Sequence, residues 1–197
     1  ASPFVFNEAM LSTPKGLSGV MLKGIDPKRA ASVTNIERQL DPARVSRRKE
    51  AQKRMRKVSL SSLTGKQGGG IDSLPGLFIG LEMAKEQELA IGDVVSLTTP
   101  VGISRLQGNA PRRVRFRVAG VFYSGIFEFD QKLIYSDVKS AQRFMGLGNT
   151  VTGIELRVKQ PDRVGLVAKR LLKKIKSFPY RTLDWRQTWQ TDLCGIL

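Results

Sequence analysis

The chain has 197 residues, 41% of them hydrophobic and 25% charged, a composition that supports a buried core and excludes a disordered tail. Its 33 lysines and arginines against 17 acidic residues give a net charge of +16, which indicates an anionic partner such as nucleic acid, phospholipid headgroups or an acidic protein. Histidine is absent, which excludes Ser-His-Asp and Cys-His catalysis and the commonest zinc ligand.

The start of the chain and its cysteine content limit other classes. Residues 1–6 lack an initiator methionine and the charged region of a signal peptide, so we expect a piece of a longer protein. No apolar run approaches the roughly 18 to 20 residues that cross a bilayer. The single Cys194 excludes an internal disulfide and a cysteine-rich metal site.

The first part of the chain predicts two strands and then a basic segment. Phe4 to Leu11 and Gly19 to Ile25 are the strands, and Asp26-Pro27 forms a turn after the second. From about Asn35 to Gly70 the sequence is rich in cations, glycine and serine, and we interpret residues 31–72 as a basic, flexible surface insertion. The cations that define this basic cluster are Arg44, Arg47, Arg48, Lys53, Arg54, Arg56 and Lys57.

The middle of the chain predicts a β-α-β run followed by a long connection. Leu77 to Gly80 is typical of a short buried strand, Leu81 to Leu89 of a helix that Gly92 ends, and Val94 to Thr98 of a second strand. Pro100 to Arg113 then forms a long loop or hairpin tip.

A strand with one buried and one exposed face follows this connection. Apolar residues alternate with arginine in residues 114–118, and the pattern continues to Tyr123. Leu133 to Tyr135 predicts another short strand. Ser136 is then placed to cap a helix from Asp137 to Met145.

The last third predicts a strand, an amphipathic helix and a second strand. Ile154 to Val158 alternates as a strand, and residues 164–175 repeat apolar side chains at helical spacing, which predicts a helix lying on a sheet. Tyr180 to Leu183 predicts the second strand. A final helix begins near Asp184 and carries an apolar stripe to Leu197, which suits either core packing or the approach to a membrane span.

One glycine-rich segment partly matches the pattern of a phosphate-binding loop. Thr64-Gly65-Lys66 precedes three consecutive glycines. A phosphate-binding loop also requires a glycine at the position of Leu60 and a serine or threonine at the position of Gln67. The segment therefore reads as a flexible linker and not as a nucleotide site.

Two carboxylates are candidates for a catalytic pair. Glu128 and Asp130 would share one face of a strand about 7 Å apart, close to the spacing of paired catalytic carboxylates. Ordinary alternation on a half-exposed strand explains the same pattern, so we assign no catalytic residues and no cofactor.

Two segments remain as candidate contact surfaces. The basic cluster suits nucleic acid or an anionic membrane surface, at about 1 kcal/mol per cation close to the membrane. No aromatic residues for base stacking interleave with it, which favours an interaction arm or a solvated helix face. The loop from Pro100 to Arg113 combines prolines, apolar groups and arginines, which suits either partner docking or a plain hairpin connection.

Several segments together resemble the periplasmic domain of lipoprotein-releasing ABC transporter permeases of the LolC/LolE type, which are related to MacB and FtsX permeases. No single segment is specific, but their order and spacing extend over about four fifths of the chain. The segments are Gly19 to Pro27, Gly80 to Ala84, Gly92 to Val95, Thr99 to Gly102, Val118 to Phe122, Asp137 to Gln142, Val151 to Leu156, and Asp184-Trp185.

The resemblance implies an α+β periplasmic core domain made of two subdomains. A membrane-proximal subdomain would combine residues 1–30 and 151–197, and an inserted subdomain would comprise residues 73–150. The full-length protein would be anchored in the inner membrane with this domain in the periplasm. It would pair with a second permease subunit and with a cytoplasmic ATPase subunit that hydrolyses ATP, so no catalysis is expected here.

The resemblance also implies partners and a binding element. Lipoproteins would be released from the inner membrane and passed to a periplasmic chaperone, with no nucleic acid involved. A protruding hairpin, the hook, recruits the chaperone in LolC-like members, and it would fall on residues 100–113, with Pro100, Gly102, Arg105, Pro111, Arg112 and Arg113 as its contact residues. The alternatives are a MacB- or FtsX-like domain that transmits conformational change, and a basic nucleic-acid-binding protein.

Overall fold

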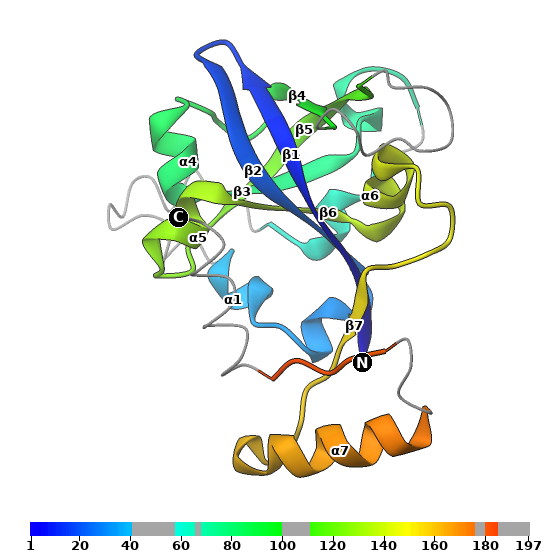
Figure 1. Ribbon diagram of the computed structural model, residues 1–197. Coiled ribbons are helices and arrows are strands. Elements are labelled where there is room, and N and C mark those ends of the chain that lie inside the picture. Colours follow the sequence, from blue (N-terminus) through cyan, green and yellow to red (C-terminus); the bar gives the residue numbers. More distant parts are fainter. Residues whose placement is uncertain (41–57, 66–67, 100–110, 176–179, 185–197) are drawn as a thin grey trace. The chain divides into compact units, whose positions relative to one another are not determined.

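The computed structural model describes residues 1–40, 58–65, 68–99, 111–175 and 180–184 (Figure 1). The chain divides into two compact units, Ala1–Leu156 and Arg157–Leu197. The first unit combines a mixed sheet with short helices, which confirms the expected α+β class.

Within the described residues, seven strands form one sheet in the order β2-β6-β3-β5-β4-β1-β7. Strands β2 and β6 and strands β3 and β5 are parallel, and the other neighbours are antiparallel. The bounds are β1 Ser2–Thr13, β2 Gly16–Ile25, β3 Gly76–Gly80, β4 Val94–Thr98, β5 Arg113–Phe122, β6 Leu133–Asp137 and β7 Gly153–Glu155.

The pairing of β1 with β2 closes six of these strands into a ring. β1 pairs with β2 from Phe4 to Thr13 and uses its other edge, near Leu11, to pair with β4. Figure 1 shows the long β1–β2 hairpin running across the other strands. The ring therefore follows the order β1-β2-β6-β3-β5-β4 and returns to β1.

An inner core fills the ring. All six ring strands contribute fully buried apolar side chains to it, and α4 (Leu81–Glu86) and α6 (Val138–Met145) add theirs. Its largest members include Leu11, Leu22, Ile79, Met83, Phe116 and Phe144. The rings of Phe116 and Phe144 pack edge to face with centroids 6.2 Å apart, so α6 is held against β5.

An outer core covers the opposite face of β2, β3 and β5. Alternate residues of a strand point to opposite faces, and Phe78 accordingly leaves the inner core and packs with Ile25 and Phe122. Buried residues from both ends of the basic insertion complete it: Ile36 and Leu40 on one side, and Leu60 and Leu63 of η2 (Leu60–Leu63) on the other. The remaining short elements here are η1 (Ala30–Ser32), α1 (Ile36–Gln39) and η3 (Ile71–Ser73).

Residues 31–72 were expected as a surface insertion, and their described parts differ from this. Apolar side chains of residues 31–40 and 58–65 are buried in the outer core against the strands of the ring. These side chains anchor both segments. The composition of the segment hides this, because its few apolar residues are spaced among many polar ones. Residues 41–57 lie outside the described part of the chain.

A β-bulge explains why β5 alternates only in its first half. Leu77 of β3 pairs with Val118 and Phe78 pairs with Gly120, which leaves Ala119 as the extra residue. Beyond the bulge β5 is buried on both faces up to Phe122.

Strand β5 lies between β3 and β4, so the expected β-α-β run is not a pair of adjacent parallel strands.

Two helices differ in detail from the sequence-based expectation. Helix α4 ends at Glu86, and Glu88 then takes a left-handed φ of 51°. The expected cap of α6, Ser136, is instead the fourth residue of β6, and Asp137 caps the helix by accepting a hydrogen bond from the Ser140 N–H at 3.0 Å. Gly146 ends α6 with a left-handed φ of 69°.

The division into subdomains differs from the expected one. β1 pairs with β4, and β2 pairs with β6, so strands from residues 1–30 and from residues 73–150 share one ring. The expected division came from the family resemblance, which relates segments of the sequence but does not show which strands pair.

The described residues of the second unit contain one well-formed helix. It comprises η4 (Pro161–Arg163) and α7 (Val164–Lys174), which agrees with the expected amphipathic helix. Residues 180–184 are described and have no regular secondary structure, so the expected strand at Tyr180 to Leu183 is not formed there. The expected final helix falls on residues 185–197, outside the described part.

Strand β3 approaches α5 (Phe127–Lys132) closely at Gly80. A Cβ at this position would overlap the backbone of Asp130, so we expect Gly80→Ala to lower the free energy of unfolding by about 2 to 3 kcal/mol. Gly19→Ala is the matched control, because nothing lies within 4 Å of its Cβ position and a strand favours alanine over glycine. Chemical denaturation of the two variants measures the difference, and equal stability would contradict the close approach.

Candidate functional site

The base of the expected hook is a regular antiparallel pair. Thr98 of β4 stands opposite Arg113 of β5, and Thr99 N–H donates to the Arg112 carbonyl at 3.0 Å. Arg112 N–H in turn donates to Thr99 Oγ1 at 2.9 Å. Residues 100–110 therefore connect neighbouring strands whose ends are fixed by hydrogen bonds, as a hairpin requires.

The structure describes three of the six expected hook residues. Pro111, Arg112 and Arg113 are exposed at the start of β5, whereas Pro100, Gly102 and Arg105 lie outside the described residues. Arg113 and Arg115 are both exposed and lie two residues apart on the same face of β5.

Arg112 differs from its neighbours because it contacts α6. Its Nη1 donates a hydrogen bond to the carbonyl of Arg143 in the last turn of the helix. Cations interact favourably with the unpaired carbonyls at a helix C-terminus. Arg112 thus joins the hairpin base to α6. Its guanidinium group is held by this contact within the domain.

The basic cluster lies outside the described residues. All seven of its cations fall within residues 41–57, so the structure neither places them near the hook nor separates them from it. The described flanks end at Leu40 and begin again at Val58, both of which pack in or against the outer core.

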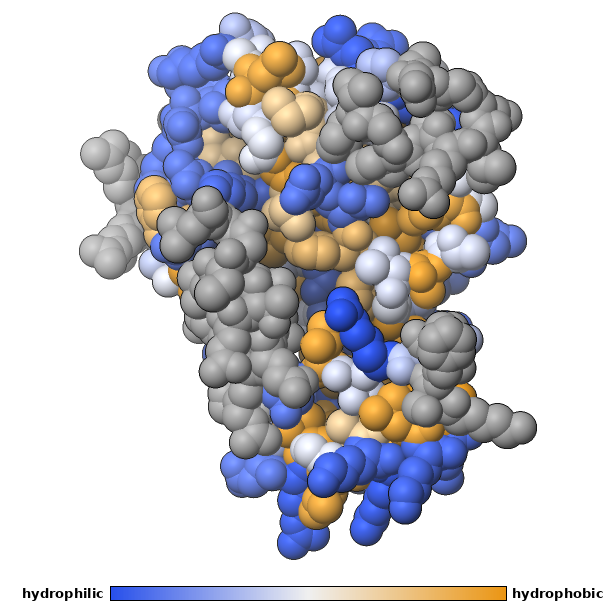
Figure 2. Space-filling model, in the orientation of Figure 1, coloured by the Kyte–Doolittle hydropathy of each residue, from blue (hydrophilic) through white to orange (hydrophobic). Residues whose placement is uncertain are grey.

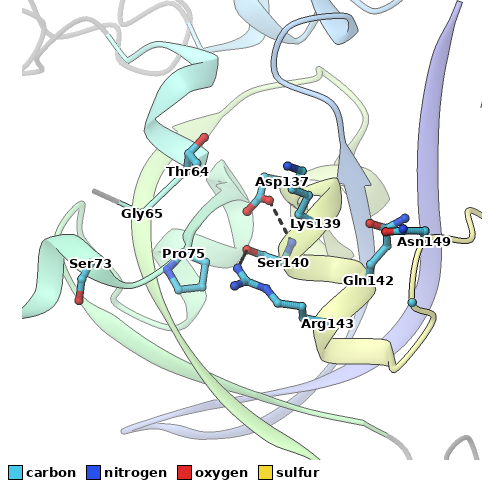
Figure 3. Close-up of a pocket in the computed structure, with 11 residues that line it drawn as sticks. Thr64, Gly65, Ser73, Pro75, Asp137, Lys139, Ser140, Gln142, Arg143 and Asn149 are labelled. Carbon is cyan, nitrogen blue, oxygen red and sulfur yellow. Dashed lines mark hydrogen bonds between the residues drawn. The ribbon is translucent and has the colours of Figure 1, made fainter. Parts of the chain in front are cut away.

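A cavity of about 510 Å³ lies between residues 64–65 and 73–75 on one side and helix α6 with the turn after it on the other (Figure 3). Most of the residues that line it have polar or charged side chains, and Asp137 faces Ser140 and Arg143 in Figure 3. Arg143 Nη2 donates to Ser140 Oγ at 3.1 Å. The complete lining is Thr64, Gly65, Ser73, Pro75, Asp137, Lys139, Ser140, Gln142, Arg143, Gly148 and Asn149.

The buried carboxylate in this cavity serves as the N-terminal cap of helix α6. Asp137 is 6% exposed and its Oδ1 caps α6, while its Oδ2 has no hydrogen-bond partner within the described residues. The positive end of the helix stabilises the carboxylate. The sequence analysis assigned the cap to Ser136, which is an equally plausible capping residue. Strand β6 extends through Ser136 to Asp137, so Asp137 caps the helix instead.

The expected carboxylate pair is not formed. Glu128 and Asp130 lie on helix α5 and not on a strand, so they do not share a face at alternating spacing. Asp130 is buried, and it accepts hydrogen bonds from the N–H groups of Ser124 at 2.7 Å and Gly125 at 3.3 Å. Its role is to hold the turn before α5.

Tyr135 is a titratable residue that packs against the outer core. Burial raises the pKa of its hydroxyl, and the negative charges of Glu155 and Asp130 add to the effect. The ring packs edge to face on Phe122 with centroids 5.1 Å apart. A neutral hydroxyl packed in this way is structural.

The described residues show no group of three or more metal-ligating side chains, and none of their helices is both long and apolar enough to cross a membrane. The described base of the β4–β5 hairpin is formed by Thr99 and residues 111–113.

Comparison with known proteins gives one curated relative. No protein-family model matches the chain. The lipoprotein-releasing system transmembrane protein LolC of Neisseria meningitidis serogroup B is 22% identical over 188 residues, which cover 94% of this chain and 39% of that protein. The chain thus spans about two fifths of the relative's length, and the expected resemblance to a LolC-type permease is confirmed.

A solved structure also aligns with the chain. The extracellular domain of the noncanonic ABC-type transporter YknZ from Gram-positive bacteria has 13% sequence identity and a TM-score of 0.45. The alignment covers 89% of this chain and 75% of that chain.

The contact between Arg112 and α6 predicts a stability effect that Arg113 lacks. We expect Arg112→Ala to lower the free energy of unfolding by about 1 kcal/mol, because the last carbonyls of α6 lose a charged donor. Arg113→Ala should change it by less than about 0.5 kcal/mol, as exposed substitutions usually do. Thermal and denaturant unfolding of the two variants measures this, and equal effects would show that the contact is not formed in solution.

Proposed function

We propose that this chain is the periplasmic binding and coupling domain of an ABC transporter permease that releases lipoproteins from the inner membrane and passes them to a periplasmic chaperone. The observation that carries the proposal is the similarity to LolC along 94% of the chain. That protein is named as a transmembrane component of a lipoprotein-releasing system, and this chain corresponds to part of it.

The β4–β5 hairpin is the element we assign to chaperone recruitment. Its base is fixed by the pairing of Thr98 with Arg113 and by two hydrogen bonds between Thr99 and Arg112. A hairpin with a fixed base loses little conformational entropy when its tip binds a partner. Arg113 is exposed at the base of the hairpin, where an arginine can contribute a charged hydrogen bond at the rim of an interface.

The remaining partners follow from the same proposal. In the full-length protein the domain is anchored in the inner membrane and acts in the periplasm, beside a second permease subunit of the same or a homologous kind. A separate cytoplasmic subunit hydrolyses ATP, and this domain has no catalytic role. Shielding of the lipoprotein's acyl chains matters, since each exposed CH₂ group costs about 0.8 kcal/mol in water.

Calorimetric titration with the periplasmic lipoprotein chaperone tests the hook. We expect the wild-type chain to bind, deletion of residues 104–110 to abolish binding, and Arg113→Glu to weaken it at least about tenfold, or 1.4 kcal/mol. Arg115→Glu is the matched control, because Arg115 lies on the same face of β5, two residues farther from the tip. Arg112 is left unchanged, since it also holds α6.

Each outcome has a distinct meaning. Full affinity after the deletion would exclude the hook as the binding element and leave the loop as a plain connection. No binding by the wild-type chain would contradict the proposal and favour a MacB- or FtsX-like domain that transmits conformational change. Equal loss in Arg113→Glu and Arg115→Glu would show that binding depends on general charge and not on the hairpin.

A further inference from the structure

One face of α7 combines cations with exposed apolar side chains. The face begins at Arg163, the residue before the helix, and continues at the i+3, i+4, i+7, i+10 and i+11 positions, which lie together on a helix. All of its members are exposed: Arg163, Leu166, Val167, Arg170, Lys173 and Lys174. We call it the basic-apolar face.

The two apolar residues of the basic-apolar face, Leu166 and Val167, are exposed to solvent. Leu166 is 57% exposed and Val167 is 40% exposed, although a second stripe of α7, at Val164, Ala168 and Leu171, is partly buried. Figure 2 shows hydrophilic and hydrophobic surface side by side over this helix. The helix therefore has two apolar stripes, and burial of one leaves the other in contact with solvent.

The charge of this face is of one sign. The sequence of α7, VGLVAKRLLKK, contains four cations and no acid, and the neighbouring acid before it is Asp162 in η4. A surface of this kind attracts an anionic partner. The interleaved apolar groups add a second requirement, because the partner must also accept Leu166 and Val167.

A bilayer surface containing anionic phospholipids meets both requirements. Phosphate groups lie a few ångströms above the acyl chains there, so a helix lying in the interface can place cations on phosphates and apolar side chains below them. Nucleic acid offers phosphates but no apolar surface at the same depth. We propose that the basic-apolar face of α7 binds anionic phospholipid headgroups, with Leu166 and Val167 entering the interface. This inference goes beyond the proposed function and does not depend on chaperone binding.

Co-sedimentation of the full chain with vesicles tests the proposal. The vesicles contain either 30% phosphatidylglycerol in phosphatidylcholine or phosphatidylcholine alone. We expect binding to the anionic vesicles that weakens with salt. Arg170→Gln/Lys173→Gln/Lys174→Gln should weaken it about 100-fold, since each cation near such a surface contributes about fivefold. Circular dichroism checks that the variant keeps its helix.

A matched control removes the same charge elsewhere. Lys28, Arg38 and Arg115 are exposed residues of the first unit, and changing all three to glutamine should weaken vesicle binding much less. Leu166→Ser/Val167→Ser keeps every cation and should weaken binding at least about fivefold, because apolar area no longer enters the interface.

Three results would overturn the proposal. They are equal binding to phosphatidylcholine vesicles, equal loss in the two glutamine triples, and unchanged binding of the serine variant together with equally tight binding to soluble polyglutamate. The last result would assign the face to an acidic protein surface. Chaperone binding is measured separately, so failure here leaves the proposed function untouched.

Discussion

The fold depends on the pairing that β1 makes along its two edges. One edge pairs with β2 from Phe4 to Thr13, and the other edge pairs with β4 and with β7. Without β1 the remaining ring strands would form an open sheet whose inner core faced solvent on one side. With β1 in place, Val5, Ala9 and Leu11 close the core. Ring closure is therefore what encloses the inner core between strands that are distant in sequence.

The same closure positions the candidate site. Strand β4 lies between β1 and β5, so the hairpin formed by residues 94–122 is held by hydrogen bonds on both sides of β4. Arg112 adds a contact from the hairpin base to α6, and Phe144 of that helix packs in the inner core on Phe116. A partner that binds at the hairpin tip would thus act on a base connected to the core through β5 and α6.

Local sequence patterns predicted the strands well and the long-range pairing poorly. Alternation located β1, β2, β4 and β6 because each has a clear buried face or clear turns at its ends. The pairing of Met21 with Leu133 joins residues that no local pattern relates. In the site, the hairpin was predictable from loop composition, whereas the contact of Arg112 with a carbonyl 31 residues away was not. Acidic residues at alternate positions suggested a strand at Glu128, where the close approach of Gly80 accommodates a helix instead.

A ring of strands also changes how the domain meets copies of itself. An open sheet exposes two edges whose unpaired N–H and C=O groups can template intermolecular β-pairing. Here β1 and β2 pair with each other, and the strand at the end of the described sheet is β7, which has three residues. A strand this short offers few backbone groups for another chain to extend. Ring closure therefore leaves short free edges in the described sheet, at β7 and at residues 16–20 of β2 beyond its pairing with β6, and lowers the risk of edge-to-edge aggregation.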